Sequence, residues 1–187
     1  MMKDNPQRLS SLSVLLHWLV GITFILLLSV GILMEETDAL ALYPLHKSVG
    51  MLLLAAAAVR MLWRAGNGWP VPLGQPGAMA VVTARAVHWM LIIGTVLMPL
   101  SGMLMSGGGG HGLSLFGLDL LAANPDPLNP GEVIPLSRSL AGVGHELHEI
   151  GGNLMIAAIL LHVIGALKHH FIDRDATLTR MLGRTPR

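Results

Sequence analysis

Two histidines, His148 and His162, lie fourteen residues apart within one apolar stretch of the chain. At about 100° and about 1.5 Å per residue, this interval places them about 21 Å apart and about 40° from eclipsed on a helix. They therefore share one helix face at opposite ends. An imidazole nitrogen is a strong ligand for iron, so each of the two needs a partner from another helix at its own depth.

Partners at matching depths are present in two other apolar stretches. His17 lies near the start of the first stretch and matches the level of His162, while His46 begins the second and matches His148. Two imidazoles on facing helices suit six-coordinate haem iron, whereas zinc requires three or four ligands at one level. The pattern predicts two b-type haems, held by His17/His162 and by His46/His148. The chain has no cysteine, which excludes disulfides, iron–sulfur clusters and covalent haem attachment.

The other histidines leave alternatives open. His88 lies at the level of His17 and competes with it for the inner site. His145 lies about 100° away from the face of His162 on the same helix and is the weaker candidate for the outer site. Three more histidines are expected in loops or at the membrane exit, exposed to solvent: His111, His169 and His170. A histidine that only bonds a carbonyl inside the bundle is the plain alternative for each position.

The elements that carry these histidines are long and almost free of charge. Apolar residues make up 52% of the 187 residues and charged residues 12%, against roughly 25% charged in soluble domains. We predict an all-α integral membrane four-helix bundle, a single domain over residues 1–187, with helices at about 13–34, 46–63, 86–105 and 148–167. Pro99 is tolerated in a membrane helix. A cleaved signal peptide is the alternative for the first stretch, but its apolar run is too long.

Basic residues predict the orientation of the bundle. With the N-terminus inside, ten basic residues are cytoplasmic (Lys3, Arg8, Arg60, Arg64, Arg85, Lys168, Arg174, Arg180, Arg184 and Arg187) and two, Lys47 and Arg138, are outside. Eight acids fall on the outer side: Glu35, Glu36, Asp38, Asp119, Asp126, Glu132, Glu146 and Glu149. Four tryptophans fall at the cytoplasmic boundary: Trp18, Trp63, Trp69 and Trp89. We expect a multi-pass protein of a bacterial inner membrane with both termini in the cytoplasm.

The long outer connection, residues 106–144, opens with four glycines and contains Asn-Pro turn signals. Its segment 113–122 is expected to form a short interfacial helix. A faint repeat also relates the first and third apolar stretches. His17-Trp18 is followed by Gly31 and Met34, and His88-Trp89 is followed by Gly102 and Met105, at identical offsets. Common ancestry of the two helices and chance similarity both account for this repeat.

Several motifs together resemble the prokaryotic cytochrome b561 family over nearly the whole chain. They are Leu16-His17-Trp18-Leu19, Leu45-His46-Lys47-Ser48-Val49-Gly50, His148-Glu149 with His162, Lys168-His169-His170-Phe171-Ile172 and Thr177-Leu178-Thr179-Arg180-Met181. The outer loop is the divergent part. The resemblance implies a four-helix dihaem cytochrome that exchanges electrons with the quinone pool. It also implies His17, His46, His148 and His162 as haem ligands.

The activity that this resemblance implies is superoxide oxidation with ubiquinone as the electron acceptor. Enzyme and pure electron carrier both stay open. The alternatives are a respiratory cytochrome b that exchanges electrons with a protein partner (a dehydrogenase, hydrogenase or soluble cytochrome) and a small non-redox transporter. Lys47 is a candidate contact for superoxide or a haem propionate, and Arg60 and Arg64 are propionate contacts or ordinary interface charges. Arg85, His88 and Trp89 are candidate quinone contacts. Membrane lipid is an expected partner, and nucleic acid is not.

Overall fold

The computed structural model describes residues 3–4, 8–70, 73 and 77–184. Its elements are α1 (Ser11–Thr37), the 3-10 turn η1 (Leu40–Leu42), α2 (Tyr43–Asn67), α3 (Ala78–Gly108), β1 (Leu113–Leu115), β2 (Leu118–Leu121), α4 (Arg138–Phe171) and α5 (Thr177–Met181). Within the described residues, four helical segments are long and apolar enough to cross a membrane. The predicted all-α membrane four-helix architecture is therefore confirmed, while the single domain over residues 1–187 stays a prediction.

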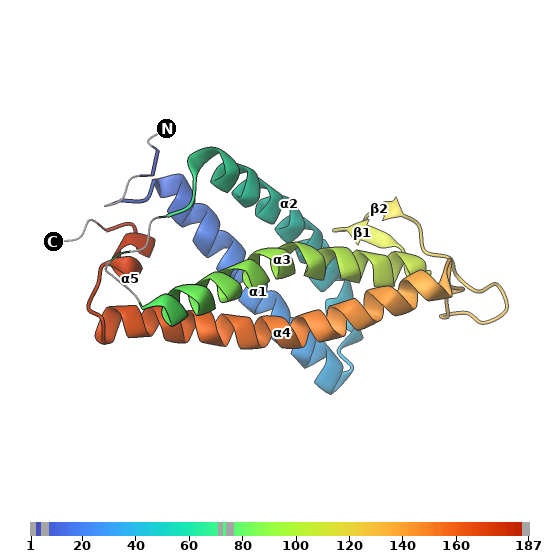
Figure 1. Cartoon of the computed structure of the whole chain (residues 1–187). Helices are drawn as coiled ribbons and strands as arrows, with labels where there is room; N and C mark the ends of the chain where they lie inside the picture. The colour runs from blue at the N-terminus through green and yellow to red at the C-terminus, as the bar shows by residue number, and fades with distance from the viewer. Residues whose placement is uncertain (1–2, 5–7, 71–72, 74–76, 185–187) are drawn as a thin grey trace.

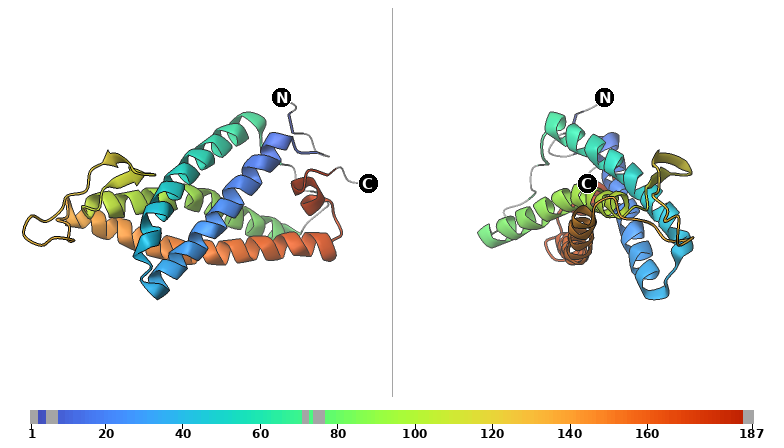
Figure 2. Two further views of the ribbon diagram at one scale, coloured as in Figure 1. Left: turned by 180° about the vertical axis from the view of Figure 1, so that it is seen from behind. Right: turned by 90° about the vertical axis from the view of Figure 1, so that its right-hand side faces the viewer.

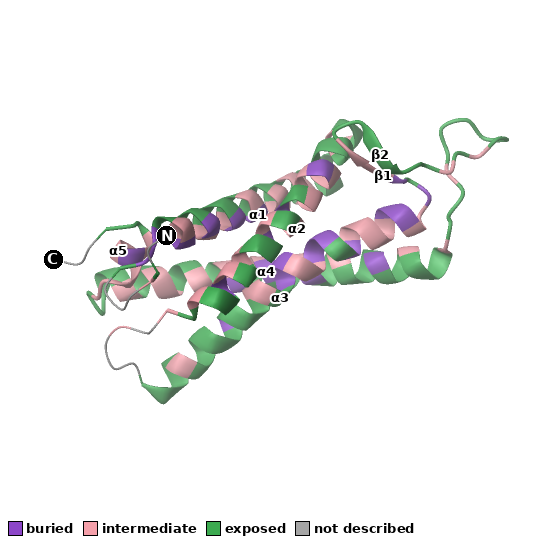
Figure 3. Cartoon of the chain, turned by 90° about the horizontal axis from the view of Figure 1, so that it is seen from above, coloured by how far each residue is buried: buried purple, intermediate pink, exposed green. Residues whose placement is uncertain are grey.

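The helices form two pairs (Figures 1 and 2). α3 and α4 pack on each other toward the loop that joins them and diverge at the N-terminal end of α3 (Figures 2 and 3); their contact is the most extensive one between described elements. α1 and α2 pack on each other and cross the first pair obliquely. The described parts near both termini lie at one end of the bundle, and the loop between α3 and α4 lies at the other. We call these the inner and the outer end.

All four long helices contribute to an apolar cluster in the middle of the bundle. Val20 and Phe24 of α1, Leu53 of α2, Met98 of α3 and Met155 of α4 pack together there. Outward-facing leucines and isoleucines are exposed on every long helix, and Figure 3 shows that buried residues face the helix contacts. A bundle whose outside is apolar is what a hydrocarbon environment requires.

Glycines allow the close approach of α3 and α4. The Met155 side chain lies against Gly94, where a Cβ atom would overlap its sulfur. The Met98 sulfur lies 2.8 Å from the position that a Cβ of Gly151 would take. Small residues at helix contacts are the usual way for membrane helices to pack without a strong hydrophobic driving force.

All four helices extend beyond their predicted bounds, and α3 begins at Ala78, eight residues before the predicted start. α4 begins at Arg138, ten residues before the predicted His148, and α3 ends at Gly108, so the connection covers residues 109–137. An apolar run marks the part of a helix in hydrocarbon, and hydrogen bonding continues the helix beyond it. Ser137 accepts from the Leu140 amide and caps this extension.

The interfacial helix expected over residues 113–122 is wrong, because this segment forms the antiparallel β1–β2 hairpin. Phe116 and Gly117 at its turn have φ of 50° and 92°. Positive φ at both turn residues matches the right-handed twist of a hairpin and ends a helix. The hairpin packs on α2 through Ser48, whose hydroxyl accepts from the Phe116 amide at 2.9 Å.

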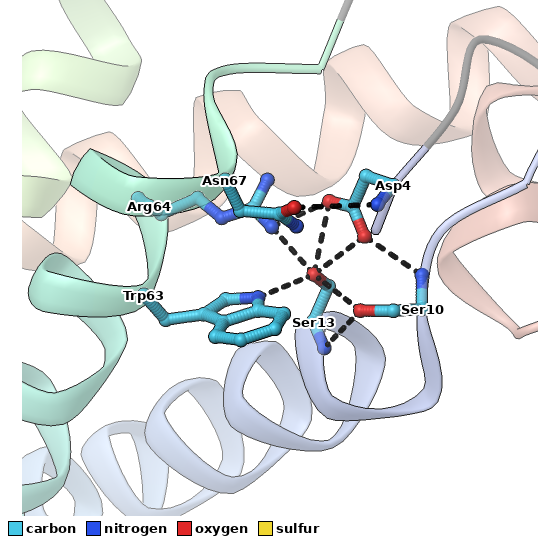
Figure 4. Close-up of polar contacts among 6 residues, drawn as sticks. All are labelled: Asp4, Ser10, Ser13, Trp63, Arg64 and Asn67. Carbon is cyan, nitrogen blue, oxygen red and sulfur yellow. Dashed lines mark hydrogen bonds and ion pairs between the residues drawn. The ribbon is translucent and has the colours of Figure 1, made fainter. Parts of the chain in front are cut away.

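A buried polar network links α1 to α2 at the inner end of the bundle (Figure 4). Arg64 binds both Asp4 and the Ser13 hydroxyl, and Trp63 donates to the same hydroxyl at 2.8 Å. Partial burial raises the pKa of Asp4, but the Ser10 amide and the groups of Arg64, Ser13 and Ser10 outweigh it, and the pKa falls to about 2. The segment that carries Asp4 is thereby tied to α2.

The C-terminal part packs against the same end. The Trp18 indole donates to the Met181 carbonyl at 2.7 Å, which joins α1 to the end of α5. Trp69 and Trp89 have ring centroids 6.0 Å apart. The four tryptophans thus gather at one end, as their sequence positions predict. Of the inner basic residues, Arg187 lies outside the described residues.

Candidate functional site

The four histidines singled out by spacing lie in two facing pairs. His17 of α1 and His162 of α4 have ring centroids 6.2 Å apart at the inner end, with ring planes at 62°. His46 of α2 and His148 of α4 have centroids 6.3 Å apart at the outer end, at 75°. All four side chains are partly buried. The structure therefore brings together the pairs that depth matching selected.

Both separations suit one metal ion between two imidazoles. Imidazole nitrogens bind transition metals at about 2.0 Å, so two rings on opposite sides of one ion have centroids roughly 6 Å apart. A direct hydrogen bond between the two rings would bring them closer. A flat macrocycle that supplies the four remaining ligands in the plane between the rings is compatible with this arrangement.

In the outer pair, hydrogen bonds hold one ring nitrogen of His148, whereas one ring nitrogen of His46 has no hydrogen bond to a described group. The Nδ1 atom of His148 lies 3.0 Å from the Met98 carbonyl oxygen and 3.1 Å from the Ser101 hydroxyl. Because a carbonyl only accepts, Nδ1 carries the proton and Nε2 keeps a free lone pair, which is how metal-binding histidines are usually oriented. The Nδ1 atom of His46 is buried, and no described group forms a hydrogen bond with it. These rings fit a haem site that uses the free lone pairs.

Two glycines flank the outer rings. A Cβ at Gly31 would lie 3.7 Å from Cε1 of His46. A Cβ at Gly102 would lie 3.2 Å from Cε1 and 3.4 Å from Nδ1 of His148. Any larger side chain at position 102 would push the His148 ring. The repeat that relates His17 to Gly31 and His88 to Gly102 therefore has a structural meaning at this end of the bundle.

Each of the four long helices carries two site residues that are fourteen positions apart, one at the inner level and one at the outer level. These residues form an inner and an outer layer, with a third layer halfway between them. The inner layer is His17, Arg60, His88 and His162, and the outer layer is Gly31, His46, Gly102 and His148. Halfway between them lies a middle layer of Phe24, Leu53, Thr95 and Met155, and all four of these residues are buried. The two histidine layers are about 21 Å apart along each helix and separated by packed side chains.

The inner layer contains a third imidazole. The His88 ring centroid lies 5.3 Å from that of His162, closer than that of His17. His88 is exposed, however, whereas the four paired histidines are partly buried. His145 is exposed, and its Nε2 lies 3.7 Å from a Glu149 carboxylate oxygen. The structure thus keeps His88 near the inner pair and places His145 in a surface contact.

The three histidines expected in solvent differ in their contacts. His111 and His170 are exposed. His169 is partly buried, and its Nδ1 lies 2.7 Å from Asp175 and 3.3 Å from Asp173. These contacts fix the turn between α4 and α5.

Lys47, Arg85 and Trp89 are the other predicted contact residues. Lys47 donates to the Ser106 hydroxyl at 3.1 Å, and Ser106 donates to the Gly112 carbonyl at 2.7 Å. This chain holds the ammonium group between α2 and the end of α3, one turn beyond Gly102. Arg85 is exposed on α3, and Trp89 lies against Trp69.

The groups that orient the outer site cannot be found from residue spacing. The Met98 carbonyl, Ser101 and Ser106 make these contacts, and an ordinary methionine and two serines in an apolar helix carry no signal of their own. The residue type of Arg60 alone indicates only one of several charges at the membrane boundary. Its interval of fourteen from His46 was the signal that places it in the inner layer.

Comparison with known proteins identifies the family. Residues 8–184 match the family described as prokaryotic cytochrome b561. "Cytochrome b561 homolog 2" of Escherichia coli (strain K12) is 32% identical, over 97% of this chain and 95% of that protein. "Probable superoxide oxidase CybB" of Yersinia pestis is 26% identical (94% and 96% covered), and "Cytochrome b561 homolog 1" of Escherichia coli (strain K12) is 26% identical (95% and 98% covered).

The chain belongs to the prokaryotic cytochrome b561 family. It is therefore a bacterial membrane cytochrome that binds b-type haem and takes part in electron transfer.

Proposed function

Taking this family membership as the premise, we propose that the chain binds two b-type haems, one between His17 and His162 and one between His46 and His148. The observation that carries the proposal is the pair of ring separations, 6.2 and 6.3 Å, at two levels of one bundle. Each bound haem supplies a reversible one-electron couple at its iron. Together the two bridge most of a membrane that a single cofactor cannot span.

The protein's own residues hold and insulate these two positions. The Met98 carbonyl keeps the proton of His148 on Nδ1, which leaves the lone pair of Nε2 as the group that would bind the haem iron. The buried middle layer, which includes Phe24 and Met155, excludes water between the two levels. A low-dielectric path of fixed length joins the two haem sites.

The orientation that fits this function has both termini in the cytoplasm of a bacterium with the chain in its inner membrane. The inner end carries the many basic residues and the four tryptophans, as the positive-inside rule and the interfacial preference of indole require. The outer end carries the acidic loop. Electrons from an outside donor then enter at His46/His148 and leave at the inner layer.

The best single activity is superoxide oxidation coupled to ubiquinone reduction. Two superoxide anions each lose one electron and become O₂, and ubiquinone takes up these two electrons with two protons to give ubiquinol. Lys47 supports this activity, because Ser106 holds its ammonium group next to the outer pair and an anion is attracted there. The relative with superoxide oxidase in its name, although only 26% identical, agrees with this choice.

The second candidate is a cytochrome b that exchanges electrons between quinone and a protein partner. The observation in its favour is the charge of the outer surface. Lys47 and Arg138 face eight acids there, and the described loop 109–137 contains three acids and no lysine or arginine. Such a surface attracts a basic soluble electron-transfer protein and repels superoxide at long range.

The haem assignment is tested by replacing one ligand at each level. His162→Leu should remove the inner haem and leave the outer one, and His148→Leu should do the reverse. The measurement is the absorption spectrum, oxidised and reduced, with a haem count per chain. His145→Leu is the matched control, because this exposed histidine lies on the same helix. Two six-coordinate haems in either ligand variant would contradict the pairing and bring His88 or His145 into the ligand set.

A further inference from the structure

Arg60 completes the inner layer and lies at the level of its three imidazoles, fourteen residues after His46 on α2. Arg64 lies one turn further along α2. The Arg60 side chain is partly buried. Within the described part of the chain, no hydrogen bond or ion pair reaches its guanidinium group.

Arg64 differs from Arg60 in this respect. Its guanidinium group is buried and bound to Asp4 and Ser13, so the protein itself neutralises its charge. Arg60 has Arg64 as a like-charged neighbour and, among the described residues, no acid forms an ion pair with it. A cation inside a membrane-spanning segment is costly unless an opposite charge is bound to it. The structure therefore has an inner-layer cation whose counterion comes from elsewhere.

We propose that Arg60 binds a carboxylate of the inner haem and raises the midpoint potential of that haem. This inference rests on the inner haem of the proposed function. Haem b carries two propionate carboxylates, and the planar fork of guanidinium binds a carboxylate through two parallel hydrogen bonds. Arg60 is partly buried at the level of His17 and His162, which favours the porphyrin as the source of the anion. A phospholipid phosphate has the same oxyanion chemistry and is the other source.

The effect on the haem follows from charge. Ferric bis-imidazole haem carries one more positive charge than the ferrous form, so a fixed cation beside it favours the ferrous form. Arg60 thus makes the inner haem easier to reduce and draws electrons toward the inner layer. Removal of the guanidinium group lowers the inner midpoint potential and leaves the outer one, about 21 Å away along the helix, nearly unchanged.

The first experiment is a redox titration of the purified dihaem protein in which both haems are followed by absorbance. Arg60→Gln should make the inner haem harder to reduce by at least tenfold in its ferrous-to-ferric ratio, or about 59 mV for a one-electron couple. Arg60→Lys, which keeps the charge, should recover most of this shift. Arg184→Gln is the control, since it removes an exposed arginine near the same end. An unshifted inner potential in Arg60→Gln would overturn the proposal.

The second experiment identifies the source of the anion. Wild-type protein and Arg60→Gln are reconstituted with haem or haem dimethyl ester, in phosphatidylcholine with or without phosphatidylglycerol. The difference between the two proteins should vanish with the ester and be independent of the lipid. A difference that persists with the ester and follows phosphatidylglycerol content would assign Arg60 to lipid phosphate and overturn the haem proposal.

Haem counts separate this failure from a failure of the proposed function. If His162→Leu retains both haems, the ligand assignment is wrong. If both haems are present and the potentials of Arg60→Gln match wild type, only the role of Arg60 is wrong. Should Arg60→Gln lose the inner haem, Arg60→Lys decides: recovery of the haem with the lysine charge supports the proposal, and continued loss overturns it.

Discussion

The bond between Asp4 and Arg64 gives a prediction whose size follows from the structure. The Asp4 carboxylate is 9% exposed, binds Arg64 and accepts from the Ser10 amide at 2.7 Å. Its pKa is lowered from 3.8 to about 2. At about 1.4 kcal/mol per unit, the ionised carboxylate stabilises the docked N-terminal segment by about 2 kcal/mol at neutral pH.

The pH dependence has a definite direction. Because the pKa is lower in the folded protein, the unfolded state binds the proton more readily as pH falls. The stabilisation is complete above the ordinary pKa of 3.8 and is lost as pH falls through about 2. At neutral pH, the same contribution is removed by Asp4→Asn, which keeps the shape of the side chain and loses the charge.

Hydrogen exchange measures this effect locally. The amides of Ser10 and Ser13 are hydrogen-bonded within the network, so their protection reports its opening. A loss of about 2 kcal/mol should lower the protection of these amides in Asp4→Asn about 30-fold. Glu36→Gln, at the exposed far end of α1, is the matched control and should change nothing. Equal protection in wild type and Asp4→Asn would refute the reasoning.

Three further outcomes are expected. Gly102→Leu should lose most of the outer haem and keep the inner one, measured by haem count, because a Cβ there already lies 3.2 Å from His148; Gly142→Leu, with open space around it, is the control. Met155→Ala should lower stability by about 2–5 kcal/mol in thermal unfolding, because it leaves a cavity in the middle layer. Lys47→Glu should slow haem reduction by superoxide at least about tenfold in stopped-flow measurements at low salt. Slow reduction of wild type at every salt concentration, with rapid reduction by a basic cytochrome, would favour the protein donor.

The fold was predictable where hydrocarbon dictates the sequence. Long apolar runs with a histidine near one end place α1 to α4, and spacing of fourteen on α4 selects the pairs that the structure brings together. The helix ends were not predictable from hydropathy, because α4 continues for ten polar and apolar residues outside the run. The hairpin was missed because its leucines fit an amphipathic helix equally well, and only the positive φ at Phe116 and Gly117 decides against it.

Side-chain partners were harder to predict than ligands. A histidine in a membrane span is conspicuous, but its orientation depends on a backbone carbonyl, and every residue has one. Met98 orients His148 through its carbonyl and fills space at Gly151 with its side chain. Neither role can be recognised from the residue type alone. Tertiary packing alone assigns both of them.

His88 is one of two inner-layer histidines whose counterpart in the outer layer is a glycine. The equivalent position on the outer layer is Gly102, which leaves room for the His148 ring, whereas His88 adds a third imidazole beside His162. An exposed imidazole next to a haem site can donate a hydrogen bond to a quinone carbonyl, and quinone reduction requires protons at this end. His88→Leu should therefore keep both haems and their spectra while it slows reoxidation of the reduced protein by a ubiquinone analogue by about a hundredfold, as for the loss of a proton donor. His170→Leu, another exposed histidine near the inner end, should have no effect. If His88→Leu instead loses the inner haem, His88 replaces His17 as the ligand, and His17→Leu should then leave that haem six-coordinate.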